Sequence, residues 1–379
     1  MKVAFFSPSA DRKNGWGEVA YELCAAYERA FDSGLDFDLY LPKSEAKKDY
    51  LKSIPFADKV HCVLPDFAFS FRNPIRLLAY LLPIRLVKKP DIIHALDFPY
   101  AVSAWRGSKK KIPYIITLCG TFYKPLNRLP DSVIFQSVYN NAAHVSAISS
   151  FTLNGSKKLF HLSPEKTSVI HAGVNYDRFI KSCDTKSVLS QYPDDAKIIL
   201  GIGALKARKG FDIVIRAMSQ VCKIVPSAIY VIVGKGSDEF FLRSLVNELG
   251  LSNSIFFATS VDDEKLPAYV QSAHVYCHTP RMVDGAFEGF GIVYLQAGVA
   301  GKPVVGSNSG GVADAVLDNK TGILVPENDP DATAQALISL LVDKELSNRL
   351  GKAGKEYAQS HDWNKIAQLY IEEYKKIFN

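Results

Sequence analysis

The sequence is poor in the residues that build disulfide scaffolds and metal centres. Its 379 residues include only six cysteines, which lie far apart along the chain and form no CxxC pair. Scattered cysteines in a chain without a secretion signal are typical of reduced thiols in apolar positions. No HExxH motif and no dense cluster of histidine and cysteine is present. We therefore expect neither disulfides nor a structural metal, and no cofactor.

Long apolar runs are also absent. No stretch reaches the roughly 18 uninterrupted apolar residues that a membrane-spanning helix needs. Residues 1–17 contain a short apolar run and an early proline, a pattern that indicates a strand and a loop rather than a signal peptide. These absences predict a cytoplasmic protein.

Charge is unevenly distributed along the chain. The formal net charge of +6 divides into +8 for residues 1–175 and −2 for the remainder. The basic half could face an anionic acceptor or a lipid surface. Although the pI is about 8.8, no nucleic-acid recognition module is evident, so we expect no nucleic-acid partner.

Two basic segments are candidates for contact with a membrane. Residues 67–89 combine aromatic and aliphatic side chains with five basic residues, which suits a peripheral helix at the inner face of a membrane. A core-facing helix broken at Pro83 is the alternative interpretation. The basic run 109–111 either extends the same surface or is a solvated loop. If both lie on one face, a lipid-linked acceptor is expected.

The length and the pattern of apolar runs predict two domains. A chain of 379 residues is too long for one ordinary core. Short apolar runs alternate with longer stretches of helical period, which favours parallel sheets with right-handed crossovers. The expected strands are Val3–Phe6, Phe37–Leu41, Ile92–Ala95, Tyr114–Thr117, Val145–Ile148 and Thr167–Ile170 in a first series, and Ile198–Ile202, Ile229–Val233, Ile255–Phe257, Val275–Cys277, Val304–Gly306 and Ile323–Val325 in a second.

This pattern predicts an α/β fold of two Rossmann-like, doubly wound parallel-sheet domains that face a cleft. We expect residues 1–177 to form the first domain and residues 178–360 the second. The C-terminal helix, residues 361–379, is expected to pack back on the first domain. Because ligands of open parallel sheets bind beyond the carboxyl ends of the strands, the motifs that follow the strands are the candidate binding residues.

Several glycine-rich and charged motifs follow the expected strands in a fixed order. In the second half they are GIGALKARKGFD (201–212), VIVGKGSD (231–238), EGFGIVYLQA (288–297), GKPVVGSNSGGVAD (301–314) and TGILVPENDPDA (321–332). The first half adds GWGEVAYEL (15–23), KPDIIHALD (89–97) and VIHAGVNYDRF (169–179). With these motifs the chain closely resembles the family 4 glycosyltransferases, which have the GT-B architecture. The resemblance covers almost the whole chain and implies a nucleotide-sugar donor, retention at the anomeric carbon and no metal requirement.

Three charged residues are the catalytic candidates that the resemblance implies. Arg208 and Lys209 match the basic residues with which the family binds the donor diphosphate, and a solvated basic loop is the alternative. Glu288 matches the first glutamate of the family's E-x7-E motif, which contacts the donor sugar, and an ordinary carboxylate at a helix start is the alternative. The family often has an arginine directly after the strand's glycine, where this chain has Ala204.

Further positions are expected to bind the donor. Gln296 replaces the second glutamate of the E-x7-E motif, so we expect weaker ribose binding without loss of the reaction. The Gly15–Gly17 turn is expected to pack near the diphosphate and the acceptor, or else to be a plain strand-to-helix turn. The base is expected to contact the Gly234–Gly236 turn and the stretch 259–261. The complete donor-binding set is Gly15, Gly17, Gly234, Gly236, Thr259, Val261, Gly289, Phe290, Gly291, Ile292 and Gln296.

The acceptor side is carried by fewer residues. Many relatives have a histidine after the strand at residues 114–117, where this chain has Cys119, and the thiol could be functional or inert and buried. Asp97 follows the strand at residues 92–95 and either contacts the acceptor or has a structural role. His94 lies inside that strand and is interpreted as a core residue.

The only DxD string, Asp36-Phe-Asp38, is not expected to bind a metal. Many transferases use such a motif to hold the donor diphosphate through a divalent ion. Here it lies inside an expected strand, whose alternation puts both carboxylates on one face, at a sheet edge or a solvated surface. The diphosphate must then be held by cationic side chains and by N–H groups at helix starts.

The sequence therefore predicts a retaining, metal-independent glycosyltransferase. It would move a hexose from a nucleotide-diphosphate sugar, with uridine favoured as the base, to a polysaccharide, lipid-linked or glycolipid acceptor. Retention without an obvious nucleophile fits front-face transfer, in which the leaving phosphate accepts the acceptor's proton. A GT-B nucleotide-sugar epimerase and a non-catalytic nucleotide-sugar binder are the alternatives.

Overall fold

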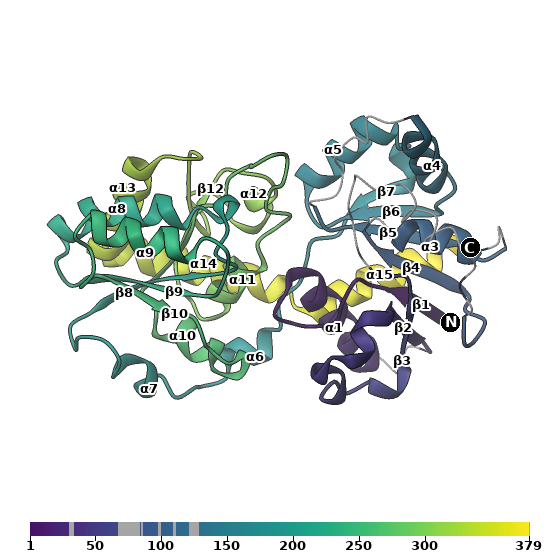
Figure 1. Ribbon diagram of the computed structural model, residues 1–379, viewed down its shortest axis with the longest axis horizontal. Helices are drawn as coiled ribbons and strands as arrows, with labels where there is room; N and C mark the ends of the chain where they lie inside the picture. Colours follow the sequence, from purple (N-terminus) through teal and green to yellow (C-terminus); the bar gives the residue numbers. More distant parts are fainter. Residues whose placement is uncertain are drawn as a thin grey trace. The chain divides into compact units, whose positions relative to one another are not determined.

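A computed structural model describes residues 1–29, 34–66, 84, 86–97, 100–108, 111–120 and 129–378, without the side chains of residues 129–133 and 135. The chain divides into two compact units (Figure 1). The first unit is Met1–Ala172 together with the C-terminal segment from Trp363, and the second is Gly173–Asp362. Each unit is an α/β layer structure built on one parallel sheet.

The first unit is built on a seven-stranded parallel sheet with the order β3-β2-β1-β4-β5-β6-β7. The central strands are continuous apolar runs, as expected for parallel strands that are covered on both faces. The strands are β1 (Lys2–Phe6), β2 (Asp36–Pro42), β3 (Val60–Leu64), β4 (Ile92–Leu96), β5 (Tyr114–Leu118), β6 (His144–Ala147) and β7 (Thr167–Val169).

Strand β3 is the one strand of this sheet that the sequence pattern did not predict. Its sequence, VHCVL, lies at the edge of the sheet and is mostly half-buried. An edge strand with one covered face lacks the continuous apolar run by which the other strands are recognised.

Five α-helices belong to the described part of the first unit. They are α1 (Gly15–Arg29), α3 (Tyr100–Ser108), α4 (Leu129–Asn140), α5 (Ser150–Phe160) and α15 (Trp363–Phe378). Figure 1 shows α15, in yellow, beside α1, and the two helices are in contact. The buried side chains of α15 recur at three- and four-residue spacing from Trp363 to Tyr374, which is the pattern of a helix with one face in the core.

A buried polar network attaches α15 to the sheet of the first unit. The hydroxyl of Tyr374 lies 2.6 Å from that of Tyr27 on α1 and 2.6 Å from Nδ1 of His94 on β4. The Nε2 atom of His94 lies 2.8 Å from Oγ1 of Thr117 on β5. Burial lowers the pKa of His94 to about 3, so the ring is neutral and both of its nitrogens are engaged within the core.

The second unit is built on a six-stranded parallel sheet with the order β10-β9-β8-β11-β12-β13. All six strands lie where the sequence predicted them. They are β8 (Lys197–Ile202), β9 (Ala228–Val233), β10 (Ile255–Ala258), β11 (Val275–His278), β12 (Val304–Ser307) and β13 (Gly322–Val325). In both units the strand order reverses beside the first strand, between β1 and β4 and between β8 and β11, so both sheets are doubly wound as expected.

The helices of the second unit cover its sheet, and α8 packs against α13 while α11 packs against α14. In α8 the apolar residues recur at helical spacing on one buried face. The helices are α6 (Tyr176–Ile180), α7 (Lys186–Leu189), α8 (Phe211–Ile224), α9 (Glu239–Glu248), α10 (Leu266–Ser272), α11 (Ile292–Val299), α12 (Val312–Ala315), α13 (Pro330–Val342) and α14 (Lys344–Ser360).

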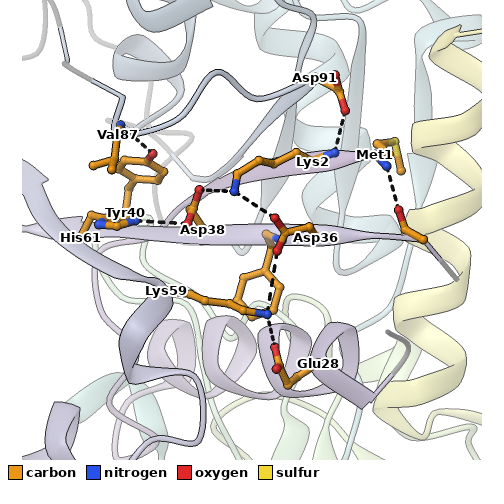
Figure 2. A network of polar contacts seen from close by, with 12 residues as sticks. Met1, Lys2, Glu28, Asp36, Asp38, Tyr40, Lys59, His61, Val87 and Asp91 are labelled. Atoms are coloured by element: carbon orange, nitrogen blue, oxygen red, sulfur yellow. Dashed lines mark hydrogen bonds and ion pairs between the residues drawn. The ribbon is translucent and has the colours of Figure 1, made fainter. Parts of the chain in front are cut away.

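The expected placement of the DxD string at an edge or a solvated surface is wrong for Asp38 and holds only in part for Asp36, whose side chain is 49% exposed. Strand β2 lies between β1 and β3, and Asp38 is only 4% exposed. Figure 2 shows the Lys2 ammonium between the two carboxylates, 2.9 Å from Asp36 Oδ2 and 2.8 Å from Asp38 Oδ2. His61 approaches the other oxygen of Asp38 at 3.2 Å. Both carboxylates therefore belong to an ion-pair network within the first unit.

Two further observations concern metals and membranes. Among the described residues, no group of three or more histidine, cysteine, aspartate or glutamate side chains is arranged to hold a metal ion. Within the same residues, no helix is long and apolar enough to cross a bilayer. The segment 67–89 lies outside the described residues apart from 84 and 86–89, and so does the basic run 109–111 apart from Lys111.

Candidate functional site

The loop after β8 carries the two basic candidates of the second unit. It contains a short 3-10 turn, Ala207–Lys209, and then Gly210, which starts α8 in the left-handed conformation with φ +67°. A Cβ atom at Gly210 would lie 1.8 Å from the carbonyl oxygen of Thr279, just beyond β11. Only glycine fits this close approach, which holds the basic turn against the end of the neighbouring strand.

The loop after β11 brings Glu288 to the same place. Its Oε2 atom lies 2.5 Å from Nζ of Lys209 and 3.2 Å from Nη1 of Arg208. The side chains of Lys209 and Glu288 are 13% and 14% exposed, so this cluster is largely withdrawn from solvent. The three catalytic candidates from the sequence are therefore in direct contact with one another.

The electrostatics of this cluster favour an ionised glutamate. Burial alone would raise the pKa of Glu288, but the charges of Lys209 and Arg208 outweigh it and lower the pKa to about 2. Burial lowers the pKa of Lys209, and the Glu288 carboxylate opposes that shift. One carboxylate thus faces two cations, and the cluster carries a net positive charge that can attract an anion.

His278, at the end of β11, is a neighbour of this cluster that the sequence analysis did not select. It is 1% exposed and stacks on Phe211 with ring centroids 5.4 Å apart. Burial first, and then the charge of Lys209, lower its pKa to about 3, so the ring is neutral. The sequence signal that could have identified His278 is a polar residue at the carboxyl end of a buried strand.

The segment after Glu288 forms the start of α11. Gly289 and Phe290 are buried, Gly291 precedes the helix with φ +96°, and Ile292 is its first residue. The main chain of this loop is fixed by a hydrogen bond from the Gly311 amide to the Glu288 carbonyl, 2.8 Å long. Gln296 lies in the second turn of α11 and is 2% exposed.

The turn after β9 packs directly on the β8 loop. Cβ atoms at Gly234 and Gly236 would lie 1.9 Å and 2.1 Å from the carbonyl oxygens of Gly203 and Leu205. The Leu205 amide also donates to the carbonyl of Lys235 at 2.9 Å. Residues 259–261, with Thr259 and Val261 half-buried, follow the next strand, β10, at the same edge of the sheet.

In the first unit, the Gly15–Gly17 turn starts α1. Gly15 is exposed, whereas a Cβ atom at Gly17 would lie 2.0 Å from the carbonyl oxygen of Asp11. The Gly17 amide donates to Oδ1 of Asn14 at 2.7 Å. Between the two glycines, the indole Nε1 of Trp16 donates to Oδ2 of Asp97 at 2.8 Å. The sequence analysis did not select Trp16.

Asp97 and Cys119, the acceptor-side candidates, are in contact with each other. The Cys119 amide donates to Oδ1 of Asp97 at 2.8 Å. Asp97 is 4% exposed and Cys119 is 8% exposed. Burial raises the pKa of Asp97 to about 7, and burial together with the nearby Asp97 carboxyl raises the pKa of the Cys119 thiol well above its ordinary value. The thiol therefore remains protonated, whereas Asp97 titrates near neutral pH.

Comparison with protein families accounts for both units. Residues 13–178 match the sequence profile described as Glycosyltransferase Family 4, and residues 185–357 match the profile described as Glycosyl transferases group 1. The chain belongs to glycosyltransferase family 4. The predicted family 4 resemblance is thus confirmed, with one profile on each unit.

Relatives and solved structures agree with the family 4 assignment. The chain is 34% identical over 233 residues to the GDP-mannose-dependent alpha-(1-6)-phosphatidylinositol monomannoside mannosyltransferase of Mycolicibacterium smegmatis, a match that covers 60% of this chain and 57% of the relative. This match and the matches to two Mycobacterium tuberculosis proteins of the same description span 57% to 60% of the relatives' length.

Two crystal structures of other proteins share the fold of this chain. One is HepE of Anabaena with UDP and glucose, with a TM-score of 0.78 and 20% identity over 99% of this chain and 100% of that one. The other is a glycosyltransferase of Rickettsia africae, with a TM-score of 0.80 and 19% identity over 100% and 98% of the two chains. The predicted GT-B type of α/β fold, with two parallel sheets, is confirmed.

Proposed function

We propose that this chain is a retaining hexosyltransferase that binds the donor diphosphate through Arg208 and Lys209. The observation that carries the proposal is the contact of both cations with Glu288 at the carboxyl ends of β8 and β11. The strand order of the second unit reverses between these two strands, and open parallel sheets bind their ligands at such reversal points. Membership of family 4 supports the same assignment.

The chemistry of the cluster suits a departing diphosphate. Transfer from a nucleotide sugar breaks the bond between the anomeric carbon and a phosphate oxygen, so negative charge grows on the diphosphate. The planar guanidinium of Arg208 can donate two parallel hydrogen bonds to phosphate, and the Lys209 ammonium adds a compact point charge. Because both groups are already held in place, little reorganisation is needed when that charge develops.

Glu288 has a second role in this proposal. Without a donor it neutralises part of the charge of Arg208 and Lys209. A diphosphate would compete for the two cations and free the carboxylate to accept hydrogen bonds from hydroxyls of the donor sugar. The proton of the acceptor hydroxyl then moves to the leaving phosphate oxygen on the same face as the new bond forms. This front-face course gives retention and requires no protein nucleophile.

We further propose that the reaction proceeds without a divalent ion, because side chains supply the positive charge at the diphosphate. The sequence analysis favoured a UDP-sugar. The 34% identical relative named above is GDP-mannose-dependent and acts on a phosphatidylinositol mannoside, so GDP-mannose and lipid-linked acceptors join the donors and acceptors to be tested. The class proposed is a nucleoside-diphosphate hexose, with a hydroxyl of a lipid-linked or carbohydrate acceptor.

Nucleotide release from a donor panel tests this function. UDP-glucose, UDP-galactose, UDP-N-acetylglucosamine and GDP-mannose are incubated with the protein and acceptor mixtures in EDTA, and the anomeric configuration of the product is read by NMR. We expect release from at least one donor and an axial product from an axial donor. Glu288→Ala should lower the rate by about 100-fold or more, as for loss of a transition-state contact. Glu264→Ala, at an exposed glutamate, is the matched control.

Each failure has a distinct meaning. Release of free nucleotide with inversion would contradict the retaining mechanism. Tight binding of a nucleotide sugar with no turnover of any donor would favour the non-catalytic binder, and interconversion of two free nucleotide sugars would favour the epimerase. Equal losses of the transfer rate in the Glu288 and Glu264 variants would show that Glu288 has no specific part in the reaction.

A further inference from the structure

Asp97 occupies the point in the first unit that corresponds to the charged cluster of the second. The strand order of the first sheet reverses between β1 and β4. Trp16 lies at the start of α1, which follows β1, and Asp97 directly follows β4. Their hydrogen bond of 2.8 Å therefore crosses the reversal point, where open parallel sheets place their ligands.

Both carboxyl oxygens of Asp97 accept a hydrogen bond from a neighbouring residue. One oxygen accepts from the indole of Trp16 and the other from the main-chain amide of Cys119, each at 2.8 Å. The side chain is 4% exposed, so an acceptor sugar has little access to it. It connects three chain segments: the glycine turn before α1, the end of β4 and the turn after β5.

Asp97 also has an unfavourable conformation and environment. Its φ of +54° lies in the left-handed region, which residues other than glycine adopt infrequently. Both of its hydrogen-bond donors are neutral, so the carboxyl is buried without a cation in these two contacts. Strained backbone and buried polar groups concentrate at functional sites, where the surrounding structure holds them in place.

We infer that Asp97 is a positioning residue for glycosyl transfer, which fixes the Gly15–Gly17 turn to the turn at Cys119 through its two hydrogen bonds. The inference rests on the proposed function. Asp97 acts through Trp16 and the Cys119 main chain, in place of the direct acceptor contact considered from the sequence. Both turns lie at the carboxyl edge of the first sheet, so their relative placement sets the shape of the acceptor side.

The ionisation of Asp97 makes this role measurable. Among the described residues, the titratable groups that interact electrostatically with it are the Cys119 thiol after β5 and the Tyr139 phenol of α4, and burial raises the pKa of both. His94, on the same strand, is neutral because burial lowers its pKa to about 3. Asp97, with its pKa raised by burial to about 7, is thus the one of these four groups that changes charge near neutral pH. Its carboxylate form accepts stronger hydrogen bonds than its protonated form.

A fluorescence titration tests the contact without any substrate. Tryptophan emission of the full chain is recorded from pH 5 to pH 9 for the wild type, Asp97→Asn and Trp16→Phe, with melting temperatures to confirm folding. The wild type should show a step with a midpoint near pH 7 that is absent from both variants. The remaining tryptophans, Trp105 and Trp363, are common to all three proteins. A step that persists in Trp16→Phe, or no step in the wild type, would overturn the inference.

The pH profile of transfer tests the role in the reaction. Wild-type kcat should rise with pH through about 7, and Asp97→Asn should lack this rise and lose about 10- to 100-fold in kcat at pH 8. The KM for the donor should change less than kcat, because the donor-binding candidates of the second unit are unaltered. Trp16→Phe keeps the carboxylate and should show an intermediate loss of kcat.

The outcomes separate this inference from the proposed function. A wild-type pH rise that survives in Asp97→Asn, or unchanged kcat in both variants, would overturn the positioning role while leaving the transferase intact. A fluorescence step near pH 7 that depends on both residues, in a protein that turns over no donor, would support the contact and contradict the proposed function.

Discussion

The Nζ atom of Lys209 lies 2.5 Å from Oε2 of Glu288, although 79 residues separate the two along the chain. They meet because β8 and β11 are neighbours in the sheet and each residue lies in the loop that leaves its strand. Gly210 permits the contact, since its main chain passes against Thr279 where a side chain would not fit. The fold of the second unit thus brings Lys209 and Glu288 together.

The ion pairs of Glu288 should make stability depend on pH in an acidic window. The pKa of Glu288 is about 2 in the folded protein, below the ordinary value of 4.5, so its contribution is complete above pH 4.5 and is lost as pH falls towards 2. Relative to Glu288→Gln, the wild type should keep a constant advantage from pH 6 to pH 8 and lose up to about 3 kcal/mol of it at lower pH. Urea unfolding at each pH measures this difference. An advantage that shrinks between pH 6 and pH 8 would contradict the assignment.

Gly210→Ala should lower the free energy of unfolding more than Gly250→Ala, which introduces the same backbone strain without a steric clash. Gly210 and Gly250 have φ of +67° and +68°, but a Cβ atom at Gly250 meets nothing within 4 Å. Gly250→Ala should cost about 1–2 kcal/mol from the left-handed conformation. Gly210→Ala should cost at least about 1 kcal/mol more, because the added atom displaces the main chain at Thr279. Equal unfolding free energies for the two variants would show that the loop moves without penalty.

Tyr374→Phe should loosen the C-terminal helix from the first unit. The substitution leaves His94 and Tyr27 without a shared partner in the core, at a cost of about 1–3 kcal/mol. Hydrogen exchange by mass spectrometry should show faster exchange across α15. Tyr176→Phe, at a half-buried tyrosine in the second unit, is the control and should leave the exchange of α15 unchanged. Unaltered protection of α15 in Tyr374→Phe would mean that apolar packing alone holds the helix.

Much of the fold could be predicted because buried parallel strands are continuous apolar runs. Strand β3 was missed because VHCVL lies at an edge with one covered face. The pattern within β2 correctly put Asp36 and Asp38 on one face, but it could not show which strands lie on either side. The neighbouring strand β1 supplies Lys2, which forms ion pairs with the buried Asp38 and the half-exposed Asp36 (Figure 2).

The candidate site could be predicted only in part. The motif resemblance identified Arg208, Lys209 and Glu288 singly, and their contact followed from the strand order, which no local pattern gives. Nothing in the Gly15–Gly17 turn itself marks Trp16 as a site residue. Its hydrogen-bond partner, Asp97, lies 81 residues away along the chain, and only the assembled sheet brings the two within hydrogen-bond distance.

We propose above that Arg208 and Lys209 bind the donor diphosphate without a divalent ion. Isothermal titration calorimetry of UDP and GDP measures this directly, in EDTA and in magnesium, for the wild type, Lys209→Ala and Lys206→Ala, the last at an exposed lysine of the same loop. We predict that at least one nucleotide binds the wild type equally well in both buffers. Lys209→Ala should weaken binding by about 10- to 100-fold, the value of a charged hydrogen bond, and Lys206→Ala should change it little. Binding that requires magnesium, or that is the same in Lys209→Ala as in the wild type, would contradict the account.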